Sequence, residues 1–80
     1  MKVTVYSTPV CPYCVMVKDF LKKHKIGFED VDVSKDRSRA DEMIRKSGGM
    51  AVPVIVINKD GSEKVIIGFN KPALEKALGL

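Results

Sequence analysis

The sequence predicts an α/β domain in which three helices flank a four-stranded mixed sheet, with the element order β-α-β-α-β-β-α. In the first half, short strand patterns are interleaved with apolar stripes of helical period. In the second half, the nearly all β-branched run Val52–Ile57 predicts a central strand covered on both faces. The Asp-Gly pair after it predicts a hairpin. Of the 80 residues, 45% are hydrophobic and 30% charged, so we expect one globular domain spanning residues 1–80.

The first strand is expected at Lys2–Tyr6, where valines alternate with Thr4 and Tyr6. A helix should follow from Tyr13 to about Lys25, with Pro12 in its first turn and Gly27 as the residue after its C-cap. This helix is amphipathic. Its apolar face consists of Cys14, Val17, Phe20 and Leu21, and its charged face of Lys18, Asp19, Lys22 and Lys23.

A second strand is expected at Phe28–Val33, which makes the first half a βαβ unit with parallel strands and a right-handed crossover. The second helix should cover Arg37–Ser47, capped by Ser34 or Asp36 and ended by Gly48-Gly49. Its apolar stripe consists of Ala40, Met43 and Ile44.

The central strand Val52–Ile57 is followed by a turn at Asn58–Gly61 and by an antiparallel strand at Lys64–Ile67. Asn70 is expected to cap the last helix, which has Pro72 in its first turn. The apolar side of this helix consists of Leu74, Ala77 and Leu78.

The net charge of +4 comes from 14 basic and 10 acidic residues. This excess is mild and does not by itself indicate a class of binding partner. The densest basic run, residues 22–25, has no interleaved aromatic residues to stack on bases, so nucleic-acid binding is not expected. No apolar run approaches the roughly 18 residues of a membrane span. No apolar leader is visible at the N-terminus either, so no membrane association and a cytoplasmic location are expected.

The two cysteines, Cys11 and Cys14, are too close in sequence to staple distant segments, which points to chemistry rather than architecture. Cys11 should lie at the N-terminus of the first helix, where free N–H groups and the helix dipole stabilise a thiolate. It is therefore the expected nucleophile, and Cys14, one turn further on, the expected resolving thiol. Pro12 stiffens the turn, and Tyr13 offers a flat, polar-tipped wall beside the nucleophile.

Two other interpretations of this cysteine pair are a metal site and an inert pair of buried thiols. Structural zinc needs four ligands. The only other soft ligand is His24, about 15 Å beyond Cys14 along the helix, so no metal site is predicted. The same distance makes His24 a surface residue rather than a catalytic base. A thiol pair that opens a helix directly after a strand favours redox chemistry over the inert pair.

Taken together, these motifs resemble those of a known protein family. The chain is similar to dithiol glutaredoxins, the smallest form of the thioredoxin-like fold, over essentially its whole length. Three motifs carry the resemblance: Cys11-Pro12-Tyr13-Cys14, Val52-Pro53 and Gly68-Phe69-Asn70. It implies an oxidoreductase that reduces protein disulfides and glutathione mixed disulfides, with glutathione as co-substrate and no tightly bound cofactor. Its implied partners are glutathione and disulfide-containing or glutathionylated proteins, and a monomer is expected.

The resemblance also implies a glutathione site. In the family, the proline that matches Pro53 is cis and faces the cysteine turn, and the backbone at Val52 pairs with the cysteinyl part of glutathione. Tyr13 flanks the same tripeptide. The γ-glutamyl end lies at the N-terminus of the last helix, which suits a carboxylate. The implied glutathione-binding residues are Tyr13, Val52, Pro53, Gly68, Phe69 and Asn70.

The chain departs from the family pattern in three places. Thr8 stands where many glutaredoxins have a basic residue, Phe69 follows Gly68 where many have a second glycine, and residues 48–51 offer no clamp for the glycyl carboxylate, for which Lys46 is the substitute.

The segment from Gly68 to Pro72 is similar to redoxins that thioredoxin reductase reduces and that donate electrons to ribonucleotide reductase. The Cys-Pro-Tyr-Cys turn favours glutathione instead. A bridged iron–sulfur cluster, known in some relatives, is disfavoured by Pro12.

Overall fold

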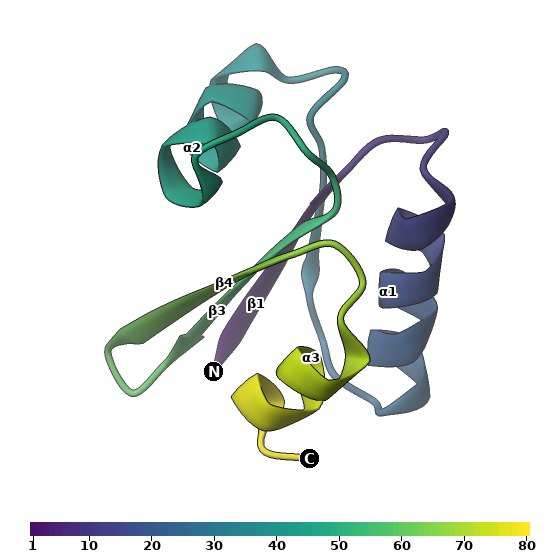
Figure 1. The fold of residues 1–80 in the computed structure, drawn as a ribbon, viewed down its shortest axis with the longest axis vertical. Coiled ribbons are helices and arrows are strands. Elements are labelled where there is room, and N and C mark those ends of the chain that lie inside the picture. Colours follow the sequence, from purple (N-terminus) through teal and green to yellow (C-terminus); the bar gives the residue numbers. More distant parts are fainter.

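The computed structural model describes all 80 residues, which form one four-stranded sheet with helices on both faces (Figure 1). The elements are β1 (Lys2–Ser7), α1 (Pro12–Lys23), β2 (Glu29–Asp32), α2 (Arg37–Ser47), β3 (Val54–Lys59), β4 (Ser62–Ile67) and α3 (Lys71–Leu78). The strand order is β2-β1-β3-β4. β1 pairs with β2 in parallel, and the other two pairs are antiparallel. The predicted element order and mixed sheet are both confirmed.

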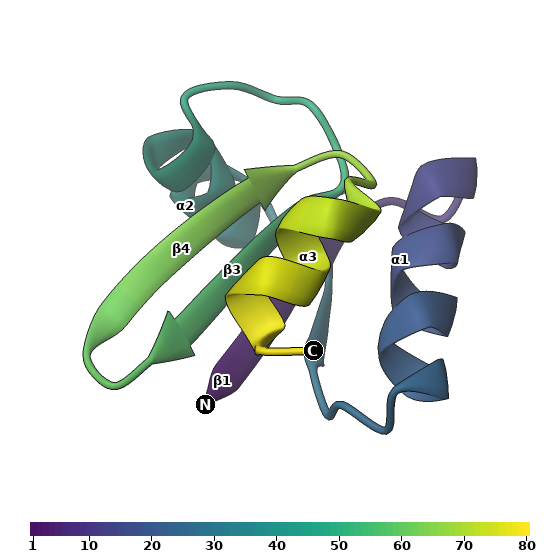
Figure 2. The same ribbon diagram turned by 60° about the horizontal axis from the view of Figure 1, so that its bottom comes forward.

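Strand side chains point alternately to the two faces of the sheet. Both faces therefore carry apolar side chains, and helices cover each of them. α1 and α3 cover one face and α2 the other, as Figures 1 and 2 show. The larger core lies under α1 and α3 and includes Val5, Leu21 and Leu74, whereas the smaller core lies under α2 and includes Tyr6 and Met43. The predicted apolar face of α1 is entirely buried. Packing of this face fixes which side of the helix points to the sheet, and Cys14 lies on that side.

The strand boundaries differ from the sequence prediction near the turns. β3 begins at Val54, two residues late, because Pro53 has no N–H to donate to the ladder. The β3–β4 hairpin is tighter than predicted: only Asp60 and Gly61 lie outside the ladder, both with positive φ (52° and 79°), as a two-residue type I′ turn requires. β2 is shorter than Phe28–Val33, since only residues 29–32 pair with β1.

The prediction that Gly27 follows the C-cap of α1 is wrong. His24 is the C-cap, and Lys25 adopts the left-handed conformation with φ 58°. The N–H of Lys25 donates to Lys22 O, and that of Ile26 to Leu21 O, in a Schellman arrangement. Ile26 then packs against the larger core. This apolar contact favours the earlier ending although a lysine carries the positive φ.

The caps of α2 and α3 confirm the sequence prediction. Asp36 accepts from the Arg39 N–H and Asn70 from the Ala73 N–H, each at 3.2 Å. Gly48 ends α2 with φ 82°. Ser34, the alternative cap, instead donates to Asp32.

A polar cluster at the β1–α2 contact was not foreseen from the sequence. The buried Tyr6 hydroxyl donates to Glu42. Arg39 ion-pairs with Glu42 and Glu29 and lies over the Tyr6 ring. Burial and the Glu42 carboxylate raise the pKa of Tyr6 to about 12, and the Tyr6 hydroxyl holds the pKa of Glu42 below its usual value of 4.5.

Replacing Glu42→Ala should lower the free energy of unfolding by about 1–3 kcal/mol, because the buried Tyr6 hydroxyl loses its acceptor. Asp41→Ala is the matched control on the same helix, exposed and without an ion pair, and should change stability by less than about 0.5 kcal/mol. Urea unfolding measures both. Because the folded pKa of Glu42 is depressed, the difference should be full above pH 4.5 and shrink as the pH falls. Equal losses at neutral pH would contradict the assignment.

Candidate active site

Cys11 is the N-cap of α1, as its place in the sequence predicts. Its backbone is extended (φ −100°, ψ 109°), and Pro12 begins the helix. The Cys11 sulfur accepts a hydrogen bond from the Cys14 backbone N–H, with an N···Sγ distance of 3.2 Å. The sulfur thus takes the place of the oxygen of an ordinary capping residue and faces the positive end of the helix.

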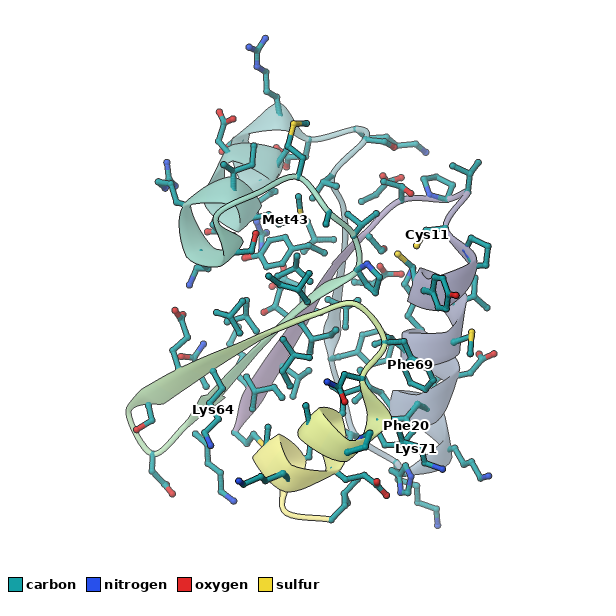
Figure 3. All side chains as sticks on the ribbon, viewed as in Figure 1. Cys11, Phe20, Met43, Lys64, Phe69 and Lys71 are labelled. Atoms are coloured by element: carbon teal, nitrogen blue, oxygen red, sulfur yellow. The ribbon has the colours of Figure 1, made fainter.

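Cys14 differs from Cys11 in exposure. Cys11, at the start of α1 (Figure 3), is half-buried, whereas Cys14 is 0% exposed. Desolvation, together with the neighbouring Cys11, raises the pKa of the Cys14 thiol to about 11. The Thr8 backbone and the Lys18 ammonium act in the opposite direction. One thiol is therefore open to a substrate, and the other is held protonated beneath it.

This asymmetry fits a two-step exchange. A thiolate placed like Cys11 can attack one sulfur of a disulfide, which breaks the S–S bond and releases a thiolate that takes up a proton. A thiol placed like Cys14 can then lose its proton and attack the first sulfur in the mixed disulfide. The second thiolate would leave and take up a proton, and the two cysteines would form a disulfide, so that two electrons pass to the other molecule.

Lys18, predicted on the charged face of α1, is more buried than a solvent-facing lysine. Its side chain is only 21% exposed, and its ammonium lies 3.0 Å from an Asp30 carboxylate oxygen on β2. Asp30 also accepts from the Ser7 hydroxyl. Cys14 and Lys18 are four residues apart, which is about one helical turn, and this spacing could have indicated that the two side chains are neighbours.

The Val52-Pro53 step lies in the segment before β3, and its peptide bond is cis, as the resemblance implies. Pro53 is buried, whereas Val52 is half-buried. The Pro53 carbonyl accepts from the Gly68 N–H at 2.8 Å, which joins two of the predicted binding segments. In both ribbon views, these segments pass beside the first turn of α1.

Gly68, Phe69 and Asn70 are brought to this region but use some of their groups internally. The Gly68 N–H is bonded to Pro53. The Phe69 ring lies 6.1 Å from the Phe20 ring, centroid to centroid and edge to face, and packs against the larger core (Figure 3). The Asn70 side-chain oxygen caps α3. In the first turn of α3, Pro72 has no N–H and the N–H groups of Ala73 and Leu74 are bonded to Asn70, so the Lys71 N–H is the donor left for a ligand there.

Lys46 does not lie free for a ligand carboxylate. Its ammonium forms an ion pair with Glu63 on β4, so its proposed substitution for the family's basic clamp has to compete with this contact. Tyr13 is 59% exposed next to Cys11, where it is free to form the expected wall.

The structure shows no set of three or more His, Cys, Asp or Glu side chains arranged to hold a metal ion. None of its helices has the length and apolarity needed to span a bilayer.

In the reduced, folded protein at pH 7.5, iodoacetamide should label Cys11 and leave Cys14 unmodified. Cys14 should react at least about a hundredfold more slowly than a free thiol, because its pKa is about 11 and it is buried. Peptide mapping after labelling measures this. In the Cys11→Ser variant, Cys14 should be labelled only in denaturant, and rapid labelling of the folded variant would refute the assignment.

Comparison with known proteins agrees with this geometry. A family model described as Glutaredoxin matches residues 3–61. An uncharacterized glutaredoxin-like 8.6 kDa protein in the rubredoxin operon of Clostridium pasteurianum is 42% identical over 76 residues, which cover 95% of this chain and 96% of that protein. Glutaredoxin 3 of Escherichia coli K12 is 32% identical over 56 residues, which cover 70% of this chain and 68% of that protein.

Among solved structures, a mutant of the thioredoxin-like protein BC3987 has a TM-score of 0.86 and 36% sequence identity, over 98% of this chain and 95% of that chain. The fold is therefore thioredoxin-like, as the resemblance implied.

Proposed function

The chain belongs to the glutaredoxin family, and on this premise we propose that it is a glutathione-dependent thiol–disulfide oxidoreductase. It reduces protein disulfides and glutathione mixed disulfides, with Cys11 as nucleophile and Cys14 as resolving thiol. Thiol–disulfide exchange is the general activity of the family. The observation that carries the role assignment is the pairing of a half-buried Cys11 at a helix N-terminus with a fully buried Cys14.

Glutathione completes the proposed cycle as the reductant. One glutathione thiolate attacks the Cys11–Cys14 disulfide, and Cys14 leaves and takes up a proton, which its pKa of about 11 favours. A second glutathione thiolate attacks the sulfur of the first, so that Cys11 leaves and glutathione disulfide is released. The proposed site lies between Tyr13, Val52 and the first turn of α3. A reducing compartment such as the cytoplasm suits this cycle.

A second candidate is a redoxin that thioredoxin reductase reduces and that donates electrons to ribonucleotide reductase. Three observations favour it. Thr8 provides no cation, Lys46 is paired with Glu63, and the Gly68 N–H is already bonded to Pro53. Each leaves the glutathione pocket with one binding group fewer than the family pattern has. The solved relative at 36% identity is also described as thioredoxin-like.

NADPH consumption with a small mixed-disulfide substrate separates the two candidates. The protein is coupled in one assay to glutathione and glutathione reductase, and in the other to thioredoxin reductase. The proposal predicts turnover through glutathione. Turnover only through thioredoxin reductase would replace it with the second candidate, whereas no turnover in either assay would contradict both.

Cys11→Ser should abolish all turnover, because no nucleophile remains at the helix N-terminus. Cys14→Ser should retain reduction of a glutathionylated substrate, which needs one thiol, and lose the two-thiol reduction of a protein disulfide. Each substitution changes only one sulfur to oxygen, so the variants are controls for each other. Activity of Cys11→Ser comparable to the unmodified protein would overturn the roles given to the two thiols.

A further inference from the structure

The charges of the protein are divided unevenly between its two helical layers. Residues 12–28 and 68–80, which contain α1 and α3, carry six lysines and two acidic side chains, a net charge of +4. Residues 29–47, which contain β2 and α2, carry five basic and six acidic side chains, a net charge of −1. The layer of α1 and α3 thus carries an excess equal to the whole formal charge of the chain.

The two layers also differ in how their charges are paired. Arg39 pairs with Glu29 and Glu42, and Lys46 with Glu63 on β4, so carboxylates neutralise two of the five basic side chains of the α2 layer. On the other layer, only Lys18 forms an ion pair. We define the basic face as the exposed, unpaired lysines at the C-terminal end of α1 and the start of α3: Lys22, Lys23, Lys25 and Lys71. The Phe69 ring packs on the Phe20 ring of α1 (Figure 3), which holds the start of α3, with Lys71, close to this helix.

The surface of α1 changes character along its length. Next to Cys11 it is apolar and exposed, with Tyr13 at 59% and Met16 at 45% exposure, and Val10, just before the helix, is 88% exposed. About two turns further on it becomes basic. The rise of about 1.5 Å per residue places Lys22 about 16 Å from Cys11 along the helix. An interface of ordinary size, about 800 Å² on each partner, reaches from one to the other.

We propose that the α1–α3 layer is a docking surface for a protein whose disulfide lies in an apolar surround with acidic side chains about 16 Å away. The apolar end of α1 contacts the apolar residues around the partner's disulfide, and the basic face attracts the partner's acidic residues. Attraction of this kind speeds association and weakens with salt. The inference rests on the proposed disulfide exchange at Cys11 and names the class of partner that reaches it.

Synthetic peptides test this surface without knowledge of the natural partner. Each peptide has two cysteines joined by a disulfide and two apolar residues next to this ring. Four identical residues follow, and the first of them lies five positions from the ring. Five extended residues span about 16 Å. The four residues are Glu, Gln or Lys. Single-turnover reduction by the fully reduced protein gives second-order rate constants that need no external reductant.

At low ionic strength, the Glu peptide should react about tenfold faster than the Gln peptide, and the Lys peptide more slowly than both. The advantage should vanish at 1 M salt, where the screening length falls to about 3 Å. Equal rates for the Glu and Gln peptides would overturn the docking surface.

Charge-reversal variants locate the effect on the protein. Lys22→Glu/Lys23→Glu/Lys25→Glu should reverse the preference. The matched control, Lys35→Glu/Arg37→Glu/Arg45→Glu, makes the same change in net charge on exposed, unpaired residues of the α2 layer and should retain it. Equal loss of preference in both would refute the proposal, because net charge alone would then explain the rates. If the reversal variant does not fold, the corresponding Lys→Gln variant should abolish the preference.

A neutral small substrate, bis(2-hydroxyethyl) disulfide, separates failure of the surface from failure of the proposed function. All folded variants should reduce it at the same rate. If the unmodified protein does not reduce it, the exchange chemistry fails and the docking surface fails with it. If it reduces this substrate but shows no preference among peptides, only the docking surface is contradicted.

Discussion

Burial of one face of α1 against the sheet is the constraint on which the site depends. Val17, Phe20 and Leu21 lie in the larger core, so the helix can neither rotate nor slide without exposing them. Complete burial of one such side chain contributes about 1.5–3 kcal/mol. With the helix held in this way, Cys14 must face the interior, since it shares the same stripe. Cys11 must then lie at the rim as the N-cap, with its sulfur on the Cys14 N–H.

The two sulfurs of this short turn lie in different environments, which is the basis of the two roles proposed for them. The Cys11 sulfur accepts from the Cys14 N–H at the helix start, whereas desolvation raises the pKa of the buried Cys14 thiol. Lys18 moderates that cost from one turn away and is itself held by Asp30. A fully apolar surround would make ionisation of the resolving thiol still less favourable. The structure thus combines protection of Cys14 from solvent with a nearby cation that favours its thiolate.

Much of this arrangement could be predicted from the sequence, because it depends on short-range patterns. The helical period marked the buried face of α1, and capping chemistry marked Asn70 and narrowed the cap of α2 to Ser34 or Asp36, of which Asp36 is the cap. The ion pairs that were missed have a common cause, which is proximity between residues far apart in the chain. The Lys46–Glu63 and Lys18–Asp30 pairs join residues 17 and 12 positions apart. Gly27 was a reasonable C-terminal signal for α1, but the packing of Ile26 placed the left-handed residue at Lys25.

The most direct test of the two thiol roles is the order in which the sulfurs react. The reduced protein is mixed with 4,4′-dithiodipyridine, quenched with acid at successive times, and mapped by mass spectrometry. The first product should be a mixed disulfide on Cys11, which then converts to the Cys11–Cys14 disulfide as the second thiopyridone leaves. Cys14 should carry no adduct at any time. An early adduct on Cys14, or a Cys11 adduct that never converts, would contradict the assignment of nucleophile and resolving thiol.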